Sequence, residues 1–454
     1  MVKCYTCKST ISDNSGSFTL RGVSRIAGCE QASIAAISIA AQALGVSELH
    51  GVYQSDATTG LIKAVQAMGA KVTYVEEVVL VEGVGVGGFA AIDIEPVLCS
   101  NTMCACTIMG ILATNPNLSF LISSNGDRTA CNRQGDTGSI ADIKAVENIL
   151  RAIGVKFQYK RGLPVAIIGI EDAPPIEVSD SISHENVKTA VLMASINIQG
   201  DNSIRAKSTL PNYVEGLLRD FSADIRVERV GSEDVITIGG QKELFACKTY
   251  VPPSTSQVLY VVGAVLILCG STVTIPQVYL DRTLESAMNI FRKMGGDASL
   301  TRSRDYECTI YVNSSRMIGA EIGVDELIDI ADELPTICIV CACSSGVTRI
   351  FGLASLRDSL KSRMNAVVSG LVECGVTASI MGDVLEIRGC GGQVTGGCTL
   401  DAKGDPRVAI PFFLLGMISQ RPIAVSGVDS EDLNVCVGAL NRFREKGDLL
   451  SCSV

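Results

Sequence analysis

Six segments of this chain are predicted to be helices that are apolar on nearly every side. Such a helix has no face to turn toward water, so other parts of the protein must cover it all round. The six segments are 32–45, 103–114, 186–200, 256–270, 335–346 and 407–419. A chain of 454 residues with six such helices is too long for one hydrophobic core, so two domains, or three, are expected.

Each apolar helix is followed by a second helix that has a polar face. The second helices are expected within 58–75, 140–159, 213–228, 283–300, 362–380 and 433–443. In the first, apolar residues recur at i, i+3, i+4 and i+7, at Leu61, Ala64, Val65 and Met68. Alternating strands such as 77–82 and 384–388 follow. The chain is therefore predicted to repeat six times a unit of about 75 residues: strand, buried helix, strand, amphipathic helix and two strands.

The composition excludes several classes of protein. The net charge of -10 argues against a nucleic-acid surface, which needs a basic face. The longest apolar run, 258–269, is too short to span a bilayer, and the N-terminus lacks the apolar core of a signal peptide. Many of the 18 cysteines sit inside apolar runs, as expected for buried thiols in a reducing compartment. The sequence predicts a soluble, cytoplasmic protein that binds neither membrane nor nucleic acid.

A proline break separates the chain into halves. Residues 250–256 read Tyr-Val-Pro-Pro-Ser-Thr-Ser, and three repeats lie on each side. Two lobes with a cleft between them are expected, and such clefts are where ligands usually bind.

Four stretches of the sequence, together with the six repeats, resemble the enolpyruvyl transferases. They are IAGCEQASIAAISIAAQALG at 26–45 and the segments 250–278, 332–353 and 405–416. The resemblance covers nearly the whole chain and is strongest to the 5-enolpyruvylshikimate-3-phosphate (EPSP) synthases. UDP-N-acetylglucosamine enolpyruvyl transferases fit less well, because their reactive-cysteine loop has no clear equivalent. RNA 3'-phosphate cyclases share the repeat, but the acidic charge of this chain and its two histidines argue against that class.

The resemblance implies a two-lobed α/β (α+β) fold, an inside-out α/β barrel with six βαβαββ repeats, three per lobe. One lobe would comprise 1–26 with 249–454 and the other 27–248, with hinges near 24–28 and 247–256.

The family reaction transfers the enolpyruvyl group of phosphoenolpyruvate to a substrate hydroxyl and releases phosphate. The resemblance implies no cofactor and no metal. Both substrates are anions, so the site needs arginines and lysines, and it needs acid–base groups to move a proton. The matching positions that keep the family residue are Asp332, which would handle the target hydroxyl, and the substrate-binding Arg133, Arg363, Arg407, Asn101 and Ser183.

Other matching positions are substituted. The lysine of the family's Pro-Gly-Ser-Lys-Ser turn is Glu30, and the lysine and glutamate of its Lys-Glu-x-x-Arg motif are Ser359 and Leu360. Further departures, some loosely aligned, fall at Ala35, Met103, Thr107, Glu185 and Glu431. Lost ammonium groups and added carboxylates around two polyanions should cripple the reaction.

The main hypothesis is therefore an EPSP-synthase-like fold that acts as a non-catalytic binding, scaffolding or regulatory subunit, a pseudoenzyme. Its ligand would be phosphoenolpyruvate or another small anion, and its partner a protein or larger assembly. The alternative is a divergent 3-phosphoshikimate 1-carboxyvinyltransferase of the shikimate pathway and aromatic amino acid biosynthesis, or a transferase for another acceptor. The retained arginines fit either anion binding or interlobe salt bridges.

Other motifs have simpler interpretations. Residues 83–88 match GxGxxG by spelling but are expected to form a loop that closes a strand. Cys4-x-x-Cys7 could supply two of the four ligands of a zinc site, but no second CxxC or CxxH pair lies nearby. The cysteines of 99–106 are expected to be small buried side chains. His184 is expected to cap a helix or face solvent rather than act as a base.

Overall fold

The computed structural model describes residues 4–9, 18–90, 101–116, 137–160, 163–304, 306–444 and 450–453. The chain divides into two compact units. Unit 1 comprises Met1–Ile26 and Ser254–Val454, and unit 2 comprises Ala27–Pro253. The chain thus leaves unit 1 before the first apolar helix and returns after Pro253. Hinge motion at these crossings remains a prediction.

The six apolar helices are confirmed, three in each unit. In unit 2 they are α1 Glu30–Ala40, α3 Thr102–Ile111 and α5 Glu185–Asn197, and in unit 1 they are α7 Thr255–Ile267, α10 Leu334–Cys343 and α12 Pro406–Gly416. Nearly every residue of these helices is buried. Within each unit the three helices contact one another.

Each apolar helix ends earlier than its sequence suggests. The first was expected to reach residue 45, but α1 ends at Ala40 and residues from Ala43 onward form strand β3, Ala43–His50. In β3, Leu44 pairs with Val84 of β5, Val78–Val84. The apolar run continues from helix into strand, so hydrophobicity alone could not locate the boundary.

The second helix of each repeat is amphipathic. These helices are α2 Asp56–Ala67, α4 Thr137–Ala152, α6 Tyr213–Asp220, α8 Arg282–Lys293, α11 Asp358–Glu373 and α13 Ser430–Asn441. After α2, Gly69 has a φ of 108°, a left-handed conformation that favours glycine at a helix C-terminus. A short helix, α9 Val324–Ile330, and the 3₁₀ turns η1 Leu112–Thr114 and η2 Leu353–Ser355 complete the described helices.

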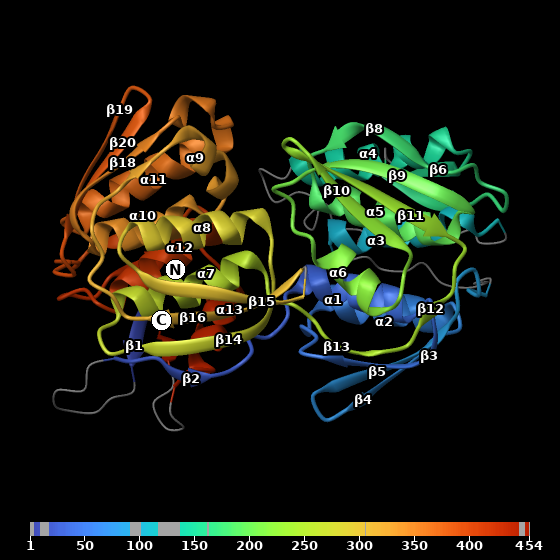
Figure 1. Ribbon diagram of the computed structural model, residues 1–454, viewed down its shortest axis with the longest axis horizontal. Coiled ribbons are helices and arrows are strands. Elements are labelled where there is room, and N and C mark those ends of the chain that lie inside the picture. Colours follow the sequence, from blue (N-terminus) through green and yellow to red (C-terminus); the bar gives the residue numbers. More distant parts are fainter. Residues whose placement is uncertain are drawn as a thin grey trace. The chain divides into compact units, whose positions relative to one another are not determined.

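Three sheets belong to unit 1. Their strands, in pairing order, are β2 Arg21–Val23, β14 Thr272–Tyr279, β16 Glu307–Asn313 and β15 Asp297–Arg304; β17 Glu321–Ile322, β18 Ser345–Phe351, β20 Val384–Cys390 and β19 Thr377–Met381; and β21 Thr399–Asp401, β22 Ala424–Ser426, β1 Cys4–Ser9 and β23 Leu450–Ser453. Sheets of unit 1 lie on opposite sides of α7, α10 and α12 (Figure 1).

Three sheets also belong to unit 2. Their strands are β12 Leu244–Phe245 and β13 Lys248–Tyr250, both beside β3, followed by β5 and β4 Lys71–Val75; β8 Glu177–Ile182, β9 Gly200–Lys207, β11 Glu233–Gly240 and β10 Ile225–Val230; and the hairpin β6 Lys156–Lys160 with β7 Leu163–Ile168. Among the described residues every sheet is open, so the barrel-like arrangement consists of separate sheets around helices.

Strands from distant parts of the chain complete several sheets. Strand β2 pairs in parallel with β14, and β12 and β13 pair in parallel with β3. Strand β1 lies between β22 and β23. In unit 1, β1 and β2 come from the start of the chain and complete two sheets. In unit 2, β12 and β13 follow the third repeat and complete the sheet of the first.

Candidate functional site

In unit 1, three helix N-termini bring charged residues together. Asp332 and Glu333 precede α10, where Glu333 is the N-cap; Arg357 is the N-cap of α11, which also carries Arg363. Asp405 caps α12, its Oδ1 accepting from the Arg407 backbone N–H at 2.9 Å. The prolines that open α10 and α12 suit the first helical turn, where the N–H that they lack has no helical partner.

Asp332 is the centre of this cluster. Its Oδ1 lies 2.9 Å from Nη2 of Arg357, 3.2 Å from Nη1 of Arg363 and 3.2 Å from Nη1 of Arg407. Arg363 also donates from Nε to Asp405 Oδ2 at 2.7 Å. The structure thus brings together three of the predicted site residues, Asp332, Arg363 and Arg407. We call Asp332, Glu333, Arg357, Arg363, Asp405 and Arg407 the arginine cluster.

The buried edge of the arginine cluster is Glu333. Its side chain is 6% exposed, and its Oε1 accepts from the Ser256 hydroxyl of α7 at 2.6 Å. The Nη1 of Arg407 lies 3.5 Å from the same oxygen. This Nη1 is buried and makes no hydrogen bond to any described residue, although two carboxylates lie within ion-pair distance. The Arg407 side chain as a whole is 37% exposed, so an anion can approach it from elsewhere than Nη1.

The charges of the arginine cluster set its ionisation. Burial alone would raise the pKa of Asp332, but Arg407, Arg357 and Arg363 outweigh it and hold that pKa below its usual value. Burial would lower the pKa of Arg407, and Glu333 and Asp332 raise it instead. Asp332 is therefore an ionised carboxylate at neutral pH.

In unit 2, carboxylates occupy the corresponding helix ends. Glu30 begins α1, and its Oε2 accepts from Asn101 Nδ2 at 2.7 Å. Asn101 is the N-cap of α3, and its Oδ1 accepts from the Cys104 N–H at 2.8 Å. Asn101 therefore links two helix N-termini and holds the Glu30 carboxylate.

A second carboxylate, Glu185, lies in the first turn of α5. The buried Tyr213 hydroxyl donates to Glu185 Oε1. Burial, with Glu185 adding to it, raises the pKa of Tyr213 well above its usual value. Burial also raises the pKa of Cys29, the N-cap of α1, to about 12, and Glu185 again contributes. Tyr213 and Cys29 are therefore neutral at pH 7.

His184 and Ser183 precede α5. The His184 side chain is 53% exposed, makes no capping hydrogen bond, and places Nδ1 3.2 Å from Asp142 Oδ1. Ser183 is exposed. His184 was expected either to cap the helix with its side chain or to face solvent, and its side chain faces solvent.

The substituted positions differ in their surroundings. Ser359 is exposed on α11, whereas Leu360 is 5% exposed and belongs to the hydrophobic core of unit 1. Ala35, Met103 and Thr107 are buried. Arg133 and the side chain of Glu431 lie outside the described residues.

Sequence reasoning missed several members of the arginine cluster. Arg357 lies in the same LRDSLKSR stretch as Arg363, so the motif itself was an available signal. The contact between Glu333 and Ser256, and that of Asp405 with Arg363, arise only because helices far apart in sequence meet at their N-termini.

In the glycine-rich segment 83–88, the first two residues end strand β5 and residues 85–88 form a loop. Strand β5 ends at Val84, and no helix begins in the described residues 85–90. A Cβ on Gly83 would lie 2.3 Å from the carbonyl oxygens of both Ala40 and Ala43. Close packing against α1 and β3 therefore accounts for this glycine. Within the described parts of the chain, no group of three His, Cys, Asp or Glu side chains could hold a metal ion. None of the described helices combines the length and the apolar character that a membrane span requires.

The two units, each built from three buried helices and three sheets, define the enolpyruvyl-transferase fold. The structure is similar to that of EPSP synthase from Acinetobacter baumannii, with a TM-score of 0.83, 21% identity and 99% of each chain covered. It is also similar to the enolpyruvyl transferase NikO from Streptomyces tendae, with a TM-score of 0.67, 15% identity, and 100% of this chain and 99% of NikO covered.

The sequence narrows this class to one family. The model of the EPSP synthase (3-phosphoshikimate 1-carboxyvinyltransferase) family matches residues 15–432. The 3-phosphoshikimate 1-carboxyvinyltransferase of Cereibacter sphaeroides is 30% identical over 414 residues, covering 89% of this chain and 90% of the relative. That of Rhodospirillum rubrum is 29% identical with the same coverage. The chain therefore belongs to the EPSP synthase family.

Proposed function

We propose that this member of the EPSP synthase family has lost the standard carboxyvinyl transfer and acts as an anion-binding subunit with a binding, scaffolding or regulatory role. The single observation that carries the proposal is Glu30. A carboxylate occupies the position of the family's lysine, and Asn101 holds it by a 2.7 Å hydrogen bond.

Electrostatics support the loss of transfer. Two unit charges about 4 Å apart interact by about 1 to 4 kcal/mol between bulk water and a protein surface. Replacing an ammonium by Glu30 reverses the sign of that interaction with an anionic substrate. Glu185 adds a second carboxylate at the neighbouring end of α5, with Tyr213 as its donor. At the starts of α1 and α5, a family reaction between phosphoenolpyruvate and shikimate-3-phosphate would therefore meet the carboxylates Glu30 and Glu185. Arg133 lies outside the described residues.

Proton transfer is the second missing element. Leu360 stands at the position of the family's glutamate and packs into the core of unit 1. Neither it nor the exposed Ser359 beside it can ionise as an acid or base at neutral pH. The step that moves a proton to and from the enolpyruvyl methylene therefore has no group at this position.

The arginine cluster supports retained anion binding. Arg357, Arg363 and Arg407 converge on Asp332, and the Arg357 side chain is 60% exposed, open to a ligand in solution. The N-termini of α10 and α12 add positive potential at the same place. Phosphoenolpyruvate or another small carboxylate or phosphate is the ligand that this chemistry fits.

One observation favours a second candidate, a divergent 3-phosphoshikimate 1-carboxyvinyltransferase or a transferase for another acceptor. Three arginines keep Asp332 ionised, as a residue that accepts a proton from a substrate hydroxyl requires.

Calorimetric titration tests anion binding. Phosphoenolpyruvate and shikimate-3-phosphate are titrated separately and together into the wild type and into Arg407→Ala, with Arg421→Ala as a surface control. We expect phosphoenolpyruvate to bind the wild type and the control, and the Arg407→Ala affinity to fall at least tenfold. Absence of binding at millimolar ligand would contradict the anion-binding role. Mutual tightening of both ligands would favour the second candidate.

A further inference from the structure

Two cysteine thiols of unit 1 lie side by side. The Sγ atoms of Cys374 and Cys398 are 3.2 Å apart, and both residues are free thiols. A disulfide has an S–S distance of about 2.05 Å, so a closing movement of about 1.2 Å would join them. Side-chain rotation can supply a movement of that size.

Backbone hydrogen bonds fix the two segments that carry these thiols. Cys374 ends α11 as its C-cap, and its carbonyl accepts from the Gly396 N–H at 3.1 Å. The Cys398 carbonyl accepts from the Ala424 N–H at 3.0 Å. The thiols are thus held near each other by the backbone on both sides, independently of any contact between the sulfurs.

The two thiols differ in access. Cys374 is fully buried, whereas Cys398 is half-buried. Burial and the neighbouring Cys398 raise the pKa of the Cys374 thiol. A reagent in solution therefore meets Cys398 first, and Cys374 is placed to attack whatever forms there.

We propose that Cys374 and Cys398 form a reversible intramolecular disulfide by exchange with a low-molecular-weight disulfide such as oxidised glutathione. The Cys398 thiolate attacks one sulfur of the oxidant, breaks its S–S bond and releases one thiolate. Cys374 then loses its proton, attacks Cys398 Sγ and displaces the second thiolate. Two protein thiols are oxidised by two electrons, and one oxidant molecule is reduced to two thiols.

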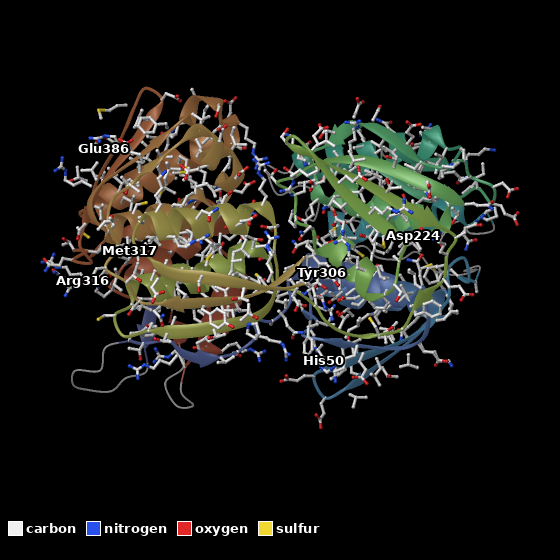
Figure 2. The ribbon with its side chains drawn as sticks, viewed as in Figure 1. His50, Asp224, Tyr306, Arg316, Met317 and Glu386 are labelled. Carbon is white, nitrogen blue, oxygen red and sulfur yellow. The ribbon has the colours of Figure 1, made fainter. Side chains whose placement is uncertain are left out.

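The crosslink would join the elements that carry the arginine cluster. Helix α11 holds Arg357 and Arg363 at its start and Cys374 at its end. Cys398 directly precedes β21, which leads to Asp405 and α12. The closed loop spans 24 positions and contains the hairpin β19–β20, on which Glu386, labelled in Figure 2, lies. Oxidation therefore restricts the unfolded chain of unit 1 and stabilises the folded one.

Peptide mapping of the full chain tests the crosslink. The protein is incubated with oxidised glutathione, alkylated and digested with trypsin without reductant. Cleavage at Arg363, Arg388 and Lys403 places Cys374 in one peptide and Cys398 in the next, together with Cys390. The variants are Cys398→Ser and, as matched control, Cys390→Ser, which alters the other half-buried cysteine of the same peptide.

The wild type and Cys390→Ser should give the peptides joined through Cys374 and Cys398, and Cys398→Ser should not. Oxidation should raise the Tm of unit 1 by roughly 5 °C in the first two, reversibly with dithiothreitol, and leave Cys398→Ser unmoved. The exposed Cys269 reports that the oxidant has acted. Glutathione on Cys269 with both Cys374 and Cys398 alkylated would overturn the proposal, as would a lasting mixed disulfide on Cys398.

Discussion

The two units share an architecture but carry different charged groups at the same helix ends. In unit 1 the ends of α10, α11 and α12 gather three arginines around Asp332, with Glu333 and Asp405 beside them. In unit 2 the ends of α1 and α5 carry Glu30 and Glu185, which accept hydrogen bonds from the neutral Asn101 and Tyr213. Apolar helices and open sheets build both units, so the fold leaves the charge at these ends free to change.

Helix physics explains why carboxylates are tolerated in unit 2. Backbone N–H groups at a helix N-terminus favour a negative charge in the first turn by about 0.3 to 1 kcal/mol. Glu30 and Glu185 both lie in first turns. A glutamate there stabilises the helix while it opposes the binding of an anion.

The largest expected effect is a loss of stability in unit 2, which contains an ion pair with both side chains buried. None of the described ion pairs of unit 1 is buried on both sides. In unit 2, Lys188 and Glu215 are 2% and 4% exposed, with Nζ 2.7 Å from Oε1. Lys188→Met should lower the free energy of unfolding by about 3 to 5 kcal/mol, because it leaves Glu215 buried without its cation. Urea unfolding measures this. The double variant Lys188→Met, Glu215→Leu is the control and should recover most of the loss; an equal loss in both would mean that packing, not charge, is responsible.

The next effect separates two arginines of unit 1. Arg363 is 16% exposed and contacts both Asp332 and Asp405, whereas Arg357 is 60% exposed and contacts Asp332. Arg363→Ala should cost about 2 kcal/mol of stability and Arg357→Ala less than about 0.5 kcal/mol, since exposed pairs contribute little. Chemical denaturation of both variants checks the ranking, and equal costs would contradict it.

A smaller effect concerns pH and unit 1. The pKa of Asp332 is lower in the folded state than its usual value of 3.8. Its contribution to stability is therefore fully present above about pH 4 to 5 and is lost as the pH falls through the lowered folded pKa. Asp332 is 44% exposed, so the change is modest. In thermal melts between pH 2 and 7, the Tm of Asp332→Asn should fall less steeply at acid pH than the Tm of the wild type. An unchanged fall would mean that Asp332 does not contribute to the loss of stability in acid.

The smallest expected effect probes Glu30. Glu30→Gln keeps an acceptor for Asn101 and should cost about 0.5 kcal/mol, whereas Glu30→Ala should cost about 1 kcal/mol. Glu30→Lys tests the comparison between the units most directly: it should destabilise α1 slightly and tighten phosphate binding. Differential scanning fluorimetry with and without phosphate measures both, and a Glu30→Lys variant with no gain in phosphate binding would weaken the electrostatic argument.

The fold could be predicted because it is encoded locally. Apolar periodicity located all six buried helices and their amphipathic partners. It could not show that Arg21 pairs with Thr272, or that Tyr250 pairs with His50, because pairing between distant strands leaves no local signal. It also overextended α1 into β3, where helix and strand are equally apolar.

The candidate site was predictable only in part. Motif positions led to Asp332, Arg363 and Arg407, and the structure brings these together. Arg357, Glu333 and Ser256 were missed, because their contacts arise when separate helix ends meet. The roles of these residues in binding and chemistry remain proposals.

The central claim is that carboxyvinyl transfer is lost, and phosphate release tests it most directly. Purified protein is incubated with phosphoenolpyruvate and shikimate-3-phosphate, with the Cereibacter sphaeroides relative as positive control and Asp332→Asn as the matched variant. We predict that wild type and Asp332→Asn both release phosphate at the rate of the protein-free background. Steady turnover by the wild type that Asp332→Asn abolishes would contradict the account and establish a divergent enzyme.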